Sequence, residues 1–175
     1  QAPERLTHGR QARSVDVWSL GCVLFYCLTG GAHPFGTRYE RDANILHGKA
    51  DLTKVHRLPE AAHLLRPMLA FDPQKRPSAK DVLEHLFWWP SEKRLLFLVD
   101  VSDRMELEDR EADTSLLAAF ERGYLSALGG AWDRSLDPLL LENLGRYRKY
   151  NPHSVRDLLR VVRNKRAHVR ELPPH

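Results

Sequence analysis

The segment 150–170 constrains the fold most, because its apolar residues recur at helical spacing. It reads YNPHSVRDLLRVVRNKRAHVR. Ser154 is a favourable N-cap residue, and Asp157 three positions later gives the start of a capping box. Arginine and lysine cover the remaining faces, beside an apolar stripe of Val155, Leu158, Leu159, Val161 and Val162. The segment predicts one amphipathic helix of about four turns that ends near His168.

Four polar residues of this segment can meet at one surface. Asn164 and His168 are four positions apart, so on a helix they lie about 40° apart around the axis and about 6 Å apart along it. Arg163 is adjacent to Asn164, and Tyr150 lies in the turn before the helix. Metal-free RNA cleavage needs such a set. One group takes the proton of a ribose 2′-hydroxyl, one protonates the leaving 5′-oxygen, and a fixed cation steadies the charge on the phosphate.

Simpler interpretations of this helix remain open. The chain carries a net charge of only +4, but residues 145–170 hold nine arginines and lysines against a single acid, Asp157. That local excess suits a polyanion. A basic helix can also simply face water or bind phosphate without specificity. Composition and spacing alone do not choose between these interpretations and catalysis.

The whole chain has the composition of a soluble globular protein. Its 175 residues, 42% hydrophobic and 29% charged, suffice for one ordinary domain or two small ones. The longest apolar run, from Val15 to Leu28, is shorter than the ~20 residues of a membrane span, so we expect this chain itself to be soluble. Cys22 and Cys27 lie five positions apart in that run and predict free thiols in a core, as in a reducing compartment.

The run SVDVWSLGCVLFYCLTGG begins at Ser14 and predicts a helix that is apolar on nearly all sides and closed by Gly30. Such a helix belongs in the middle of a core. Asp16 near its start would then be a buried charge that needs hydrogen-bond partners. Further along, Ser78 with Asp81 predicts a capped helix through about residue 86.

The second half begins at an aromatic cluster, Phe87, Trp88 and Trp89. These rings could stack on nucleic-acid bases, but the apolar helix that follows at once favours a packed seam between two domains. Short helices are then predicted from Thr114 or Ser115 to Phe120 and from Pro138 to Leu144. The predicted core residues of this half are Trp132, Leu139, Leu140, Leu141 and Leu144.

Several strings in the second half closely resemble one known family. GRYRKY (145–150), SVRDLLRVVRNKRAH (154–168) and RELP (170–173) resemble the ribonuclease (KEN) domain of the inositol-requiring kinase/endoribonucleases of the unfolded protein response. Together with GRYRKY, the strings LEDRE (107–111) and ALGGAWD (127–133) are most similar to the plant branch. The resemblance implies that Tyr150 is the general base, His168 the general acid, Arg163 the phosphate-holding cation and Asn164 a positioning group. It also implies a 2′,3′-cyclic phosphate product and no metal or other cofactor for the ribonuclease.

The first half resembles the C-terminal half of a eukaryotic protein-kinase large lobe. The similar strings are Ala-Pro-Glu (2–4), HPFG (33–36) and DPQKRPSAKDVLEH (72–85). This resemblance implies that Glu4 pairs with Arg76 and that Asp16 holds the backbone of the catalytic loop, all three in structural roles. The chain contains no glycine-rich loop, strand lysine, His-Arg-Asp or Asp-Phe-Gly motif. The pocket for ATP or ADP and Mg would therefore belong to the full-length kinase domain.

Together these features predict an all-α fold with two domains. Residues 1–88 would form the helical part of the kinase large lobe, packed rigidly on a small ribonuclease domain, residues 89–175, that we expect to be truncated at its C-terminus. The implied partners are stem-loop mRNA and a second copy of the full-length protein, at the cytosolic face of the endoplasmic reticulum membrane. A noncatalytic dimerisation or scaffold fragment and a nonspecific RNA-binding domain are the alternatives. We favour the ribonuclease for the whole protein and the scaffold for this chain alone.

Overall fold

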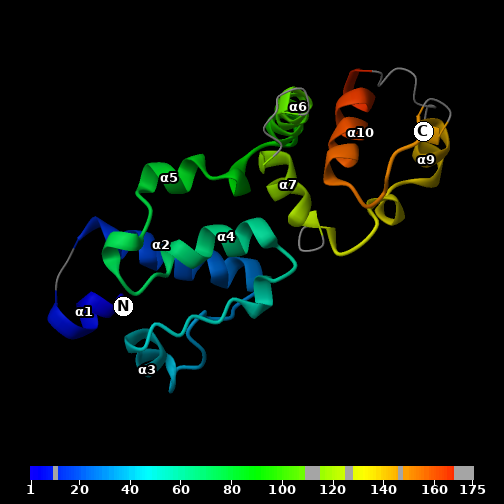
Figure 1. The fold of residues 1–175 in the computed structure, drawn as a ribbon. Coiled ribbons are helices and arrows are strands. Elements are labelled where there is room, and N and C mark those ends of the chain that lie inside the picture. The colour runs from blue at the N-terminus through cyan, green and yellow to red at the C-terminus, as the bar shows by residue number, and fades with distance from the viewer. Residues whose placement is uncertain (10–11, 109–114, 125–127, 146–147, 168–175) are drawn as a thin grey trace. The chain divides into compact units, whose positions relative to one another are not determined.

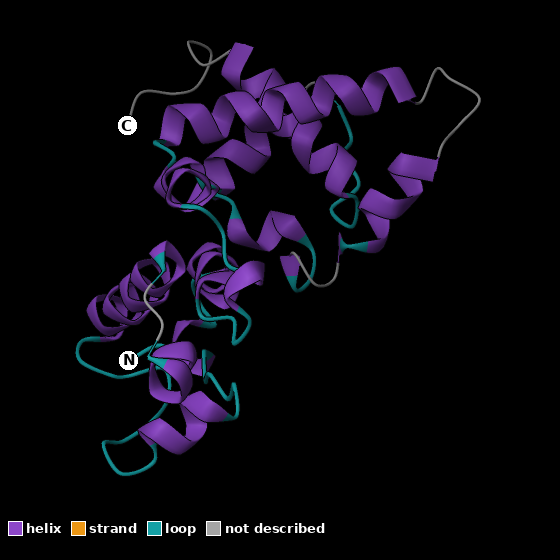
Figure 2. Cartoon of the chain, turned by 90° about the vertical axis from the view of Figure 1, so that its left-hand side faces the viewer, coloured by secondary structure: helices purple, strands orange, loops and turns teal. Residues whose placement is uncertain are grey.

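The computed structural model of the chain describes residues 1–9, 12–108, 115–124, 128–145 and 148–167, and these contain helices and loops but no strand (Figures 1 and 2). The all-α prediction is confirmed. The chain divides into two compact units, Gln1–Trp89 and Pro90–His175. Rigid packing of one unit on the other stays a prediction. Within the described ranges, no helix is both long enough and apolar enough to cross a membrane.

The first unit is built around the long helix that the apolar run predicts. Helix α2 packs along α4, and the indole of Trp18 stacks on the ring of Phe35 with centroids 5.3 Å apart. Phe25 and Leu65 are also fully buried in this core. The elements of the unit are α1 (Pro3–His8), α2 (Arg13–Thr29), α3 (Arg41–Leu46), η1 (Thr53–Val55), α4 (Pro59–Met68), η2 (Pro73–Lys75), α5 (Ala79–Glu84) and η3 (Leu86–Trp88).

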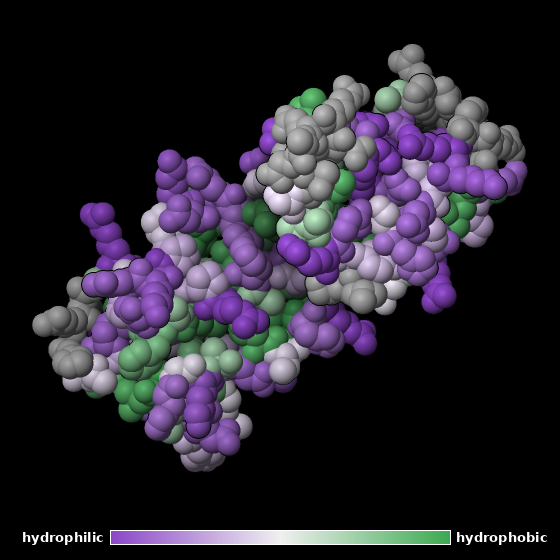
Figure 3. Space-filling view, viewed as in Figure 1, coloured by the Kyte–Doolittle hydropathy of each residue, from purple (hydrophilic) through white to green (hydrophobic). Residues whose placement is uncertain are grey.

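One face of α2 is exposed, which corrects two predictions. Leu20, Val23 and Tyr26 keep 50–57% of their surface exposed, so the helix is not surrounded by core. Asp16 is also exposed rather than buried, because it lies one turn before Leu20 on the same face. Apolar surface is visible among hydrophilic residues on the side of the first unit that Figure 3 presents.

Local capping in the first unit follows the sequence. Ser78 accepts a hydrogen bond from the Asp81 N–H, and the Asp81 carboxylate accepts one from the Ser78 N–H, so the predicted capping box is confirmed.

The two cysteines are both free thiols, but only Cys22 is buried. Cys27 is exposed, against the prediction that both lie in a core. Burial raises the pKa of the Cys22 thiol to about 12, which makes it a poor nucleophile.

The second unit is a small helical cluster in which α10 packs along α6 and also contacts α7. Its elements are α6 (Ser91–Glu108), α7 (Ser115–Arg122), η4 (Trp132–Ser135), α9 (Pro138–Gly145) and α10 (Val155–Ala167). Trp132, Leu144 and Val161 are buried in its core, whereas Leu139, predicted to be in the core, is 58% exposed. The amphipathic helix predicted from residue 155 is confirmed as α10.

Candidate active site at the start of α10

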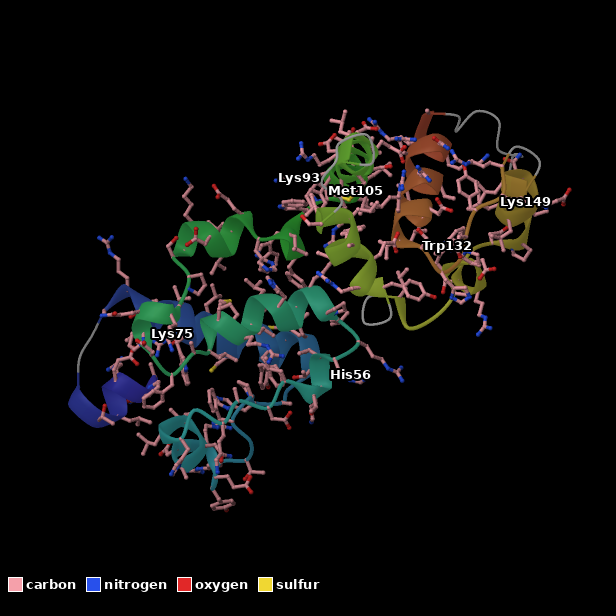
Figure 4. The ribbon with its side chains drawn as sticks, viewed as in Figure 1. His56, Lys75, Lys93, Met105, Trp132 and Lys149 are labelled. Atoms are coloured by element: carbon pink, nitrogen blue, oxygen red, sulfur yellow. The ribbon has the colours of Figure 1, made fainter. Side chains whose placement is uncertain are left out.

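The turn before α10 is held by two buried aromatic side chains. The indole N–H of Trp132 (labelled in Figure 4) donates to the carbonyl oxygens of Asn151 and Ser154, each at 3.1 Å. The hydroxyl of Tyr124 lies 2.6 Å from Nδ1 of His153. Because these contacts anchor successive residues of the turn, the backbone around Tyr150 has a defined position relative to the core.

The first turn of α10 is capped from two directions. The Ser154 hydroxyl accepts a hydrogen bond from the Asp157 N–H at 3.1 Å, as the sequence predicts. The Asp157 carboxylate accepts from the Asn151 N–H at 2.8 Å. A second carboxylate, that of Glu121 on α7, accepts from the Ser154 hydroxyl and from the N–H groups of Val155 and Arg156. Sequence reasoning missed Glu121, because no local pattern links it to a helix that begins 34 residues later.

Tyr150 and Asn164 are brought into direct contact. The side-chain amide of Asn164 donates a hydrogen bond of 2.9 Å to the Tyr150 hydroxyl. The half-buried Tyr150 ring packs against the core around Trp132, and its hydroxyl faces the end of α10. The guanidinium carbon of Arg148 lies 5.8 Å from the centre of the Tyr150 ring, within the range of a cation–π contact. Two of the four residues named from the sequence therefore share one local site.

Arg163 faces a different neighbour. Its guanidinium donates to the carboxylate of Asp103 on α6 at 3.2 Å, and its side chain keeps 26% of its surface exposed. Adjacent residues of a helix point about 100° apart, so Asn164 faces Tyr150 while Arg163 faces α6. His168, the fourth predicted residue, lies outside the residues that the structure describes.

Other arginines of α10 are paired with acids as well. Arg160 binds the Glu106 carboxylate through two nitrogens, one of them at 3.0 Å, and also contacts Asp157 at 3.0 Å. Arg156 lies 3.6 Å from the same Glu106 carboxylate. The hydrogen bonds from Arg160, opposed by burial and aided by the nearby positive charges, hold the pKa of the Glu106 carboxyl below its ordinary value.

These pairs change the interpretation of the basic helix. The arginines at 156, 160 and 163 face acids of α6 or α10, so they do not form an open basic stripe. Among the described basic residues of this region, those with exposed side chains are Arg148, Lys149 and Arg166. Arg148 and Lys149 belong to the turn that bears Tyr150, and Arg166 belongs to the last turn of α10, which also bears Asn164. The exposed positive charge therefore lies on the two elements that carry the candidate site.

In the first unit, Glu4 and Arg76 form the ion pair named from the sequence. Two guanidinium nitrogens of Arg76 contact the two carboxylate oxygens of Glu4 at 2.7 and 2.9 Å. The fully buried Arg76 side chain also donates to the carbonyl oxygens of Ser14, Ala70 and Phe71. Although burial alone raises it, the pKa of the Glu4 carboxyl is held below its ordinary value by the Arg76 hydrogen bonds. The pair ties α1 to the segment before α5.

Among the residues that the structure describes, no group of three or more histidine, cysteine, aspartate or glutamate side chains could hold a metal ion.

Two family models together match almost the whole chain. The model of the protein kinase domain matches residues 1–88, and the model described as Ribonuclease 2-5A matches residues 94–175. The two matches define a chain that joins part of a kinase domain to a ribonuclease domain. The crystal structure of Rad53 kinase domain and SCD2 is similar to 49% of this chain, with 28% identity and a TM-score of 0.42, over 33% of its own length.

The relatives are kinase/endoribonucleases. The chain is 56% identical over 173 residues to "Serine/threonine-protein kinase/endoribonuclease IRE1b" and 56% identical over 174 residues to "Serine/threonine-protein kinase/endoribonuclease IRE1a", both from Arabidopsis thaliana, and 99% of this chain is covered in each case. It is 50% identical over 171 residues to IRE1 from Oryza sativa subsp. japonica, with 98% covered. The chain belongs to this kinase/endoribonuclease family, and it spans about a fifth of the length of these relatives.

Proposed function

We propose that this chain carries the ribonuclease part of a kinase/endoribonuclease, in residues 94–175, and that this part cleaves RNA at the site around Tyr150 in the longer protein. The observation that carries the proposal is the 2.9 Å hydrogen bond between Asn164 and the Tyr150 hydroxyl. It joins two of the predicted catalytic residues within a unit that matches a ribonuclease family. The exposed cations nearby supply the positive surface that an RNA backbone requires.

In the proposed reaction, Tyr150 takes the proton of a ribose 2′-hydroxyl. The 2′-oxygen attacks the adjacent phosphorus, the bond from phosphorus to the 5′-oxygen breaks, and His168 protonates that oxygen. The products are a 2′,3′-cyclic phosphate and a 5′-hydroxyl. Arg163 steadies the nonbridging oxygens, and Asn164 holds the Tyr150 hydroxyl in place. None of these steps requires a metal or another cofactor.

Arg163 must exchange partners to play this role. In the described part of the chain its guanidinium is paired with Asp103, whose side chain is 62% exposed. An exposed ion pair of this kind contributes little to stability and is screened by salt. An RNA phosphate that enters the site can therefore compete with Asp103 for the guanidinium.

The proposal extends to the longer protein. One relative, 45% identical over 169 residues, bears the name "Sensor for unfolded proteins in the ER ire1" in Schizosaccharomyces pombe. By analogy, we propose a sensor of endoplasmic-reticulum stress whose kinase domain binds ATP or ADP with Mg. Its ribonuclease would act on stem-loop mRNA from the cytosolic face of the membrane, and would work as a homodimer.

The test is cleavage of an end-labelled RNA hairpin by this chain in EDTA. Cleavage, which we expect to be weak or absent until the rest of the protein is supplied, should leave a cyclic-phosphate end and be lost, by at least about a hundredfold, in His168→Asn and in Tyr150→Phe, because each lacks a proton-transfer group. Arg134→Gln is the matched control for charge, since Arg134 is an exposed cation of η4 with no role in the proposed site.

If the chain alone does not cleave, the same variants are tested with the chain substituted for the matching fifth of Arabidopsis IRE1b. Activity that appears only there, and is lost in His168→Asn, supports the site and shows that it needs the rest of the protein. Absence of cleavage in both forms would contradict the proposal. Binding with a strong salt dependence but no cleavage would favour a nonspecific RNA-binding domain.

A further inference from the structure

We propose that Glu121 is a positioning residue for the reaction at Tyr150. This inference rests on the proposed function. The Glu121 carboxylate on α7 accepts three hydrogen bonds from the start of α10: from the Ser154 hydroxyl at 2.6 Å, from the Val155 N–H at 2.9 Å and from the Arg156 N–H at 3.0 Å. It therefore satisfies helix-start donors that have no partner within the helix.

The placement of Glu121 is unfavourable for its own helix. It is the penultimate residue of α7, where the negative end of the helix dipole repels a carboxylate. The positive end of α10 offsets this repulsion, because the carboxylate lies directly on its first N–H groups. A carboxylate at this position thus stabilises the junction of α7 with α10 rather than α7 itself.

The junction is connected to Tyr150 by a short series of hydrogen bonds. Glu121 fixes Ser154, whose hydroxyl accepts from the Asp157 N–H. The Asp157 carboxylate in turn accepts from the N–H of Asn151, the residue that follows Tyr150. Asn164 lies on the same helix and bonds the Tyr150 hydroxyl. Both ends of the Tyr150–Asn164 contact therefore depend on where α10 begins.

The consequence for catalysis is specific. Loss of the Glu121 carboxylate would let the start of α10 shift relative to α7 and would loosen the placement of the Tyr150 hydroxyl. Displacement of a reacting group by about 1 Å can cost on the order of a hundredfold in rate. The exposed cations Arg148, Lys149 and Arg166 remain in place, so RNA binding should be largely preserved.

The test compares Glu121→Gln with Glu92→Gln, an exposed acid on α6 that makes the same chemical change away from the site. The test uses this chain alone. If cleavage appears only when the chain replaces the matching part of Arabidopsis IRE1b, the test uses that longer protein instead. We expect Glu121→Gln to lower kcat about tenfold, with KM for the RNA hairpin within about twofold of the original. Glu92→Gln should leave both unchanged.

A second variant separates positioning from simple helix capping. Ser154→Asp combined with Glu121→Ala supplies a new carboxylate cap from within the helix but removes the connection to α7. Positioning predicts that this double variant regains thermal stability relative to Glu121→Ala without regaining kcat. Recovery of kcat together with stability, or an unchanged kcat in Glu121→Gln, would overturn the proposal.

The NMR signals of the Tyr150 ring test the placement of Tyr150 without a measurement of activity. We expect these signals to shift in Glu121→Ala and not in Glu92→Gln. Unshifted signals would overturn the inference about Glu121. The wild-type chain could fail to cleave RNA both alone and within Arabidopsis IRE1b while the Tyr150 signals still shift in Glu121→Ala. That result would contradict the proposed function and leave the structural connection standing.

Discussion

The two units use arginine in opposite ways. In the first unit, Arg76 is fully buried and donates to a carboxylate and to three backbone carbonyls, so every partner is fixed by the fold. In the second unit, Arg163 is partly exposed and contacts one acid, Asp103, that is itself mostly exposed. Arg160 lies between these extremes, with 13% exposure and two acidic partners. The degree of burial thus decides whether an ion pair stabilises the fold or remains available for a ligand.

The physical reason is the cost of leaving a charge without a partner. A buried guanidinium that loses its carboxylate cannot recruit water, so breaking such a pair costs several kcal/mol. An exposed guanidinium is hydrated as soon as its partner leaves, so the pair is worth about 0–1 kcal/mol. A residue that must bind and release phosphate belongs in the second class. Arg163 has this property and Arg76 does not.

The largest expected effect is therefore in the first unit. Glu4→Gln should lower the free energy of unfolding by about 3 kcal/mol, toward the lower end for a broken buried pair, because Glu4 retains 14% exposure. The measurement is urea unfolding followed by circular dichroism. Glu84→Gln is the control: it breaks the exposed pair with Lys80 and should cost less than about 0.5 kcal/mol. Equal effects of the two substitutions would contradict the comparison.

A smaller effect is expected for Glu106→Gln in the second unit. It removes a charged hydrogen-bond partner of Arg160 that is 24% exposed, so we expect a loss of about 1–2 kcal/mol at pH 7. Asp100→Asn on the exposed side of the same helix should change the stability little.

The effect of Glu106 should also depend on pH. Its folded-state pKa is depressed, so the stability it contributes is fully present above its ordinary value of 4.5 and is lost as the pH falls through the folded-state pKa. The difference in unfolding free energy between wild type and Glu106→Gln should therefore shrink in acid. A difference that is constant from pH 7 to acid would show that Glu106 acts through packing rather than charge.

The sequence predicts local features of the site better than its tertiary partners. The period of the apolar residues and the cap at Ser154 place the start of α10 at Val155, because both depend only on neighbouring residues. The acids that neutralise α10 could not be found this way. Asp103 and Glu106 lie 60 and 54 positions before their arginines, and only the packing of α6 against α10 brings them together.

The same limit explains the error at Asp16. Its helix reads as apolar on nearly all sides, which predicts burial for every position. Which face is buried depends on what packs there, and in this structure the neighbours of α2 cover Val15, Trp18 and Phe25 but not the face of Asp16. In contrast, Glu4 and Arg76 could be paired despite a separation of 72 positions, because the resemblance to a kinase carries tertiary information that spacing does not.

The smallest effect on stability is expected at the site itself. Asp103→Asn removes the exposed partner of Arg163 and should change the unfolding free energy by less than about 1 kcal/mol. If Asp103 competes with phosphate for the guanidinium, the variant should bind an RNA hairpin more tightly at low salt, by about threefold, with a salt dependence steeper by about one unit of slope. Fluorescence anisotropy in EDTA over a range of salt measures both, with Asp100→Asn as the control. Weaker binding in Asp103→Asn would mean the reverse: Asp103 holds Arg163 in the orientation that phosphate needs, and the two charges act as a fixed pair like the one in the first unit.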